Sequence, residues 1–127
     1  MNETLNIEER KPIWIALSEF YLDVELQESD LSHIALMVFE SPYSINKVKK
    51  INKYEVFPVL QPNLLSVAGA WAGFDEEWLI NSITDSLTKR KAIKTIGIEI
   101  SYLLFKWMCK EYWEKLDKAY DQIKTNT

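Results

Sequence analysis

The sequence has 127 residues, of which 47% are hydrophobic and 27% are charged, a composition typical of one globular domain that excludes a disordered chain. The net charge of -4 excludes a chain that binds nucleic acid or anionic membranes by its overall charge. We therefore predict a single helical domain over residues 1–127, with residues 1–8 and 118–127 frayed at its ends.

The few glycines and prolines, 3 and 4 in the chain, favour helices over a sheet with tight hairpins. Pro12 fits the first turn of a helix, and the apolar residues that follow it predict a helix near 11–22. A second helix is predicted over 31–40, with Ser29 or Asp30 as its N-cap. Ser44 is the predicted N-cap of a third helix.

The second half of the chain begins with an irregular pattern. Prolines and glycines interrupt residues 54–74, which predicts short, tightly packed helical turns. Asp75 is the predicted N-cap of a helix near 76–87. An unbroken helix over 91–124 would be about 50 Å long, so it should protrude or break, and Gly97 is a possible weak point. We predict an all-α fold: a compact, irregular or orthogonal bundle of about five to seven helices with a long C-terminal helix.

The residue types needed for catalysis and metal binding are sparse. His33 is the only histidine and Cys109 the only cysteine, which excludes paired histidine ligands and an internal disulfide. Asp75 and the two glutamates after it are better explained by the helix dipole than by acid–base chemistry. We expect no enzyme activity, no cofactor and no metal.

The remaining features of the sequence bear on localisation and on excluded partners. The N-terminus lacks the pattern of a signal peptide and no stretch is apolar enough to span a membrane, so we expect a cytoplasmic protein. Two basic clusters, at residues 47–53 and 89–94, are interpreted as solvated helix surfaces because arginine is nearly absent. Nucleic acid and membranes are therefore not expected as partners.

The charge is distributed unevenly along the chain. Residues 1–40, which we call the acidic front, hold nine acidic and two basic side chains, whereas residues 41–127 hold ten acidic and thirteen basic ones. One interpretation is an ordinary soluble surface with capping acids, and the other is a docking surface for a basic protein. For the second, the candidate partner-binding residues are Glu19, Asp23, Glu25, Glu28 and Asp30, with Tyr43 as an aromatic anchor.

Four segments of the chain carry a family resemblance: residues 9–18, 40–44, 55–69 and 71–79. They begin Glu-Arg-Lys-Pro-Ile-Trp, Glu-Ser-Pro-Tyr-Ser, Glu-Val-Phe-Pro-Val-Leu and Trp-Ala-Gly-Phe-Asp. These segments resemble a small, uncharacterised domain family of proteobacterial proteins, over most of residues 9–90. The resemblance implies a stand-alone bacterial domain of the size often seen in immunity proteins, and it brings no site residues.

Three functions follow as hypotheses. The first is an immunity protein that occludes a cognate bacterial toxin, possibly a nuclease, through the acidic front. The second is a regulatory or adaptor domain that binds another bacterial protein through a groove lined by Trp71 and Trp78. The third, an enzyme using carboxylates around Asp75, requires that Asp75 is not bonded to its own helix. Either a monomer or a homodimer is compatible with the apolar pattern of the C-terminal helix.

Overall fold

A computed structural model describes residues 6–22, 25–65, 73–90 and 92–126. These ranges are helical and contain no strand, which confirms the predicted all-α fold. The α-helices are α1 (Ile7–Ser18), α2 (Glu28–Glu40), α3 (Ile45–Ile51), α4 (Phe57–Leu65), α5 (Glu76–Thr88), α6 (Ala92–Phe105) and α7 (Lys110–Thr125). Three short segments join them: η1 (Glu19–Tyr21) and η3 (Lys106–Cys109) are 3-10 turns, and η2 (Asn52–Val56) is a π-helical turn.

The first helix begins one turn earlier than predicted. The side chain of Asn6 accepts a hydrogen bond from the backbone N–H of Glu9 at 3.2 Å, and this cap starts α1 at Ile7 instead of near residue 11. Pro12 consequently lies inside the helix. Its ring is on the exposed side, where water can bond the carbonyl group that proline leaves without a donor.

The predicted caps of the next helices were partly right. The Ser44 hydroxyl accepts from the N–H of Lys47 at 3.1 Å, and Asp75 accepts from the N–H of Trp78 at 2.8 Å, which confirms both caps. The start of α2 was wrong, because neither Ser29 nor Asp30 is its cap. The Asp30 carboxylate instead accepts from the N–H of Gln27 at 2.9 Å, so Asp30 lies within the first turn of a helix that begins at Glu28.

Residues 45–65 are helical throughout, and α3 passes through η2 into α4 without an interruption. The π-helical turn contains one residue more than an α-helical turn. The positions of the sequence that face the core are therefore shifted by one after it. Val48 and Ile51 face the core before η2, Val56 faces it at the end of η2, and Leu60 faces it afterwards. This shift explains why the apolar period of the sequence is interrupted here.

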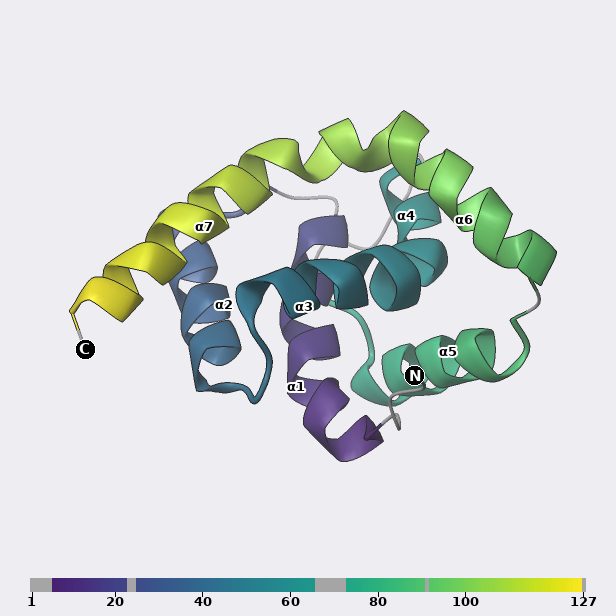
Figure 1. The fold of residues 1–127 in the computed structure, drawn as a ribbon, viewed down its shortest axis with the longest axis horizontal. Coiled ribbons are helices and arrows are strands. Elements are labelled where there is room, and N and C mark those ends of the chain that lie inside the picture. The colour runs from purple at the N-terminus through teal and green to yellow at the C-terminus, as the bar shows by residue number, and fades with distance from the viewer. Residues whose placement is uncertain (1–5, 23–24, 66–72, 91, 127) are drawn as a thin grey trace.

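The predicted long C-terminal helix is confirmed, since residues 92–125 are helical from α6 through η3 into α7. Gly97 lies within α6, and the chain tightens at η3 instead, where Cys109 enters the core with its Sγ 3.7 Å from the carbonyl oxygen of Phe20. One glycine costs a helix only about 1 kcal/mol and leaves its hydrogen bonds intact, so it does not force a break. Figure 1 shows α6 and α7 as an arc along the outer edge of the molecule, with α7 packed along α2.

The core is built around α1, which contacts α2, α5 and η2. Its apolar side chains Ile13, Trp14 and Leu17 are completely buried. Leu116 is the completely buried residue that α7 contributes to this core. The edge-to-face contact of Phe20 with Trp113, with ring centroids 5.0 Å apart, joins the start of α7 to the same core.

Candidate protein-binding site

The structure separates the predicted docking residues into exposed and occupied ones. Glu25, in the segment before α2, and Glu28, the first residue of α2, are exposed. Glu19 and Asp30 are half-buried, and Asp23 lies outside the described residues. Burial raises the pKa of Glu19, as does the negative charge of Asp30, so these two carboxylates lie close to each other.

Basic side chains of α7 reach the exposed part of the acidic front. Lys115 forms an ion pair with Glu111 at 3.1 Å, and the charges of Glu25 and Glu28 further raise its pKa. Lys118 and Glu28 line the same surface depression. The acidic front is therefore a mixed surface in space, since the basic second half of the sequence is folded against it.

Tyr43, the predicted anchor, is half-buried and holds an internal cation. The guanidinium carbon of Arg10 lies 4.9 Å from the centroid of its ring, a cation–π contact. The face of the ring that meets Arg10 is thus occupied within the fold.

Arg10 belongs to a buried charged cluster that sequence reasoning missed. Its Nε and Nη2 donate to the two carboxylate oxygens of Glu55 at 3.0 and 3.1 Å, and Trp14 donates to the same carboxylate at 2.8 Å. Burial lowers the pKa of Arg90, an effect that the charge of Glu55 partly offsets. Both arginines of the chain therefore act on Glu55. The available signal was the presence of Arg10, Trp14 and Glu55 in the segments that carry the family resemblance.

The most exposed apolar surface of the described residues runs along α6 into η3. We call it the α6 face, and it consists of five large side chains. Their exposed fractions are 60% for Ile96, 56% for Ile100, 69% for Leu103, 60% for Leu104 and 65% for Trp107. Soluble monomers rarely leave such a continuous apolar row in water, so this surface is the strongest candidate for a protein contact.

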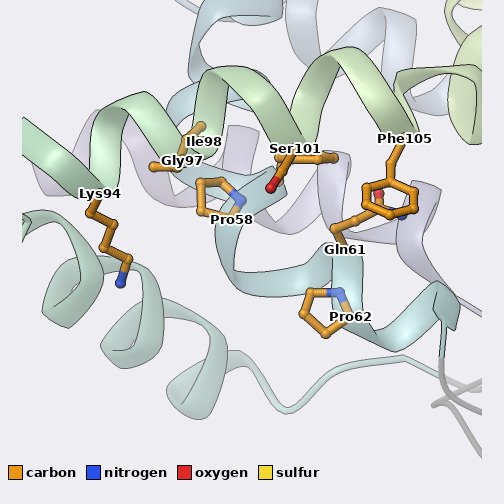
Figure 2. Close-up of a pocket in the computed structure, with 9 residues that line it drawn as sticks. Pro58, Gln61, Pro62, Lys94, Gly97, Ile98, Ser101 and Phe105 are labelled. Carbon is orange, nitrogen blue, oxygen red and sulfur yellow. The ribbon is translucent and has the colours of Figure 1, made fainter.

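The opposite side of α6 forms a groove of about 360 Å³ against α4 (Figure 2). Lys94 and Phe105 lie at its two ends, and Pro58 and Ser101 lie between them. Gln61 is 5% exposed and donates to Met108 Sδ at 3.1 Å. Its Oε1 has no hydrogen-bond partner among the described residues. The lining is mainly apolar, and no group that could act as a nucleophile or base faces it from the described residues except the serine and the lysine.

The second predicted groove is only partly described. Trp78 is 49% exposed and its ring stacks on Phe74 with centroids 6.0 Å apart. Trp71 lies outside the described residues. Trp78 thus adds one exposed aromatic side chain on α5.

The candidate catalytic groups have structural roles or lie apart. Asp75 caps α5 by accepting a hydrogen bond from the N–H of Trp78. The carboxylate-enzyme hypothesis required an Asp75 that is not bonded to its own helix, and this condition is not met. His33 is exposed on α2, whereas Cys109 is buried. In the described part of the chain no group of three or more His, Cys, Asp or Glu side chains could hold a metal ion. No helix in that part is long and apolar enough to cross a bilayer.

Burial predicts a loss of stability at alkaline pH. It raises the pKa of the Cys109 thiol from 9.0 to about 12 and that of Tyr21 well above 10.0. The folded state therefore retains protons that the unfolded state releases, so the stabilisation is complete below about pH 9 and decreases as the pH rises towards 12. We expect the free energy of unfolding to fall by about 2 to 3 kcal/mol between pH 8 and 11 from Cys109 alone.

Urea unfolding followed by circular dichroism across this pH range tests the expectation, with Cys109→Ala as the variant in which the cysteine part of the slope disappears. The folded thiol should also resist a thiol reagent at pH 8 and react in urea. Rapid modification of the folded protein would contradict the buried, protonated thiol.

One comparison with known proteins gives a match. The family model described as Domain of unknown function (DUF7079) matches residues 8–119. The chain belongs to the DUF7079 family. The match includes the charged cluster around Glu55 and all of the α6 face. No curated protein and no solved structure is significantly similar to this DUF7079 chain.

Proposed function

We propose that this DUF7079 chain is a protein-binding domain whose contact surface is the α6 face. The observation that carries the proposal is the exposure of five large apolar side chains in one row along α6 and η3. Burial of a Leu, Ile or aromatic side chain contributes roughly 1.5 to 3 kcal/mol. A partner that covered the row would gain several such contributions, and helix faces of this kind are a common mode of recognition.

A cognate toxin is the second candidate partner, and the exposure of Glu25 and Glu28 favours it. These carboxylates can steer a basic protein towards the start of α2 even though Lys115 lies near them. We propose on this basis an immunity role, in which the chain occludes a bacterial toxin, possibly a nuclease, in the cytoplasm. The two surfaces differ in chemistry, so their contributions to binding can be separated.

The experiment co-expresses the chain with the product of the neighbouring open reading frame and measures toxicity, binding and salt dependence. An immunity protein rescues growth, and the paired substitution Glu25→Gln and Glu28→Gln slows association and reduces its salt dependence. Binding through the α6 face is instead lost in Leu103→Lys and is insensitive to salt.

Leu36→Lys is the matched control, because Leu36 is also exposed, at 42%, but lies on α2. If the neighbouring product is neither toxic nor bound, the immunity role is rejected. If Leu103→Lys and Leu36→Lys bind every tested partner equally, the α6 face is not the contact surface.

A further inference from the structure

We infer that the α6 face binds the α6 face of a second copy of this chain, as an antiparallel pair of helices around a two-fold axis. The inference rests on the proposed function, because it names the occupant of the same surface. It commits to a homodimer and leaves the start of α2, with Glu25 and Glu28, free for another partner.

The spacing of the exposed residues matches the seam of two packed helices. Ile96, Ile100, Leu103 and Trp107 follow one another at intervals of four, three and four residues. This alternation is the one that places apolar side chains along the contact line of a helix pair. Leu104 lies beside the line and widens it.

The packing of α6 within its own chain uses the other side of the helix. Ile98 is buried, and the ring of Tyr102 meets the ring of Phe57 edge to face with centroids 5.0 Å apart. The seam is therefore a second apolar side on one helix, and nothing in the described residues covers it.

The area of the α6 face is sufficient for a stable dimer. An aliphatic side chain of four carbons presents roughly 130 Å² of apolar surface, and a tryptophan roughly 200 Å² or more. At the exposed fractions given above, the face offers roughly 450 Å² per copy, or about 900 Å² in a dimer. Since about 60% of an interface is apolar, the total is about 1,500 Å², within the size range of specific interfaces.

The face is complementary to itself when one copy is turned end over end. In an antiparallel pair whose centre lies between residues 101 and 102, Ile100 of one copy meets Leu103 of the other, and Ile96 meets Trp107. All four side chains are apolar and more than half exposed in the single chain. Both contacts occur twice, as a two-fold interface requires.

The charges along the other edge of the seam support the same arrangement. Glu99 and Lys106 are separated by two turns, and the antiparallel pair brings Glu99 of one copy towards Lys106 of the other. Glu99 is held in place by Lys53, at 2.5 Å, and by the hydroxyl of Tyr54, at 2.6 Å. A fixed carboxylate opposite an exposed lysine favours this pairing.

Sedimentation equilibrium of the full chain tests the dimer. We expect the mass of two chains, 14.9 kDa each, at protein concentrations above about 10 μM. Ile100→Lys and Leu103→Lys together should weaken the association at least about 100-fold, while Leu36→Lys leaves it unchanged. Circular dichroism confirms that each variant is folded, as expected for substitutions at exposed positions.

A cross-linking experiment tests the orientation. Ile96→Cys and Trp107→Cys variants are mixed with a short thiol-reactive linker, to which the buried Cys109 is inert. The antiparallel pair requires cross-links between the two different variants. A wild type that is monomeric at about 500 μM, a dimer that persists in the double lysine variant, or the absence of mixed cross-links would each overturn the inference. If the wild type is monomeric but Leu103→Lys still loses a tested partner, the proposed function stands and only its occupant was wrong.

Discussion

Glu55→Gln is expected to destabilise the protein by about 3 to 5 kcal/mol, the usual effect of removing one partner from a buried ion pair. The side chains of Arg10 and Glu55 are only 7% and 12% exposed. The amide that replaces the carboxylate carries no charge, so the guanidinium of Arg10 remains buried without its counter-ion. Trp14 and Arg90 lose the same negative charge.

Urea unfolding measures this loss, and Glu8→Gln is the matched control. Glu8 also pairs with a base, Lys11 at 2.8 Å, but its side chain is 82% exposed, so its removal should change stability by less than about 1 kcal/mol. Replacing Arg10 and Glu55 together by Met should recover part of the loss, because Arg10 no longer remains buried without its counter-ion, while Arg90 still lacks the charge of Glu55. Equal effects of Glu55→Gln and Glu8→Gln would contradict the importance of the cluster.

Leu116→Ala is expected to destabilise the protein by about 2 to 5 kcal/mol through the cavity it leaves. Leu116 is completely buried and belongs to the contact of α7 with the core. Because α7 packs mainly along α2, we expect the loss to appear first as faster hydrogen exchange in α7. Calorimetry measures the loss of stability, and amide hydrogen exchange shows which helix loses protection.

Leu104→Ala is the control for this substitution, since it removes the same atoms from an exposed side chain. At protein concentrations well below the dissociation constant of the proposed dimer, Leu104→Ala should change the free energy of unfolding by less than about 0.5 kcal/mol. A loss of the same size in both variants would mean that Leu104 is buried in solution even at such dilution.

The predictability of the fold differed from one element to the next. Ser44 and Asp75 could be identified as caps because each precedes a regular apolar pattern with a suitable side chain. Asn6 was missed because Pro12 offered a more familiar start for α1. The 3-10 turn η3 within the long C-terminal helix was not apparent from the sequence, since it lies where Cys109 enters the core, a tertiary effect.

The candidate site was harder to predict because charge along a sequence is not charge in space. Glu25 and Glu28 lie far from Lys115 in the chain, yet α7 brings them together. The α6 face was visible only as part of a long apolar pattern that could equally belong to the core. The side of α6 that packs inward is decided by its contacts with η2 and with Phe57 of α4, which no local pattern specifies.

The extra residue of the π-helical turn makes the length of η2 adjustable by one residue. Val56 and Leu60 follow Ile51 by five and nine positions, so deletion of one residue from Asn52–Val56 leaves spacings of four and eight, which an ordinary α-helix places on one face. Leu60 would then stay in the core. Deletion of one residue from α4, by contrast, would rotate the side chains after it by about 100°. The η2 turn should therefore tolerate the loss of one residue far better than the α-helix that follows it.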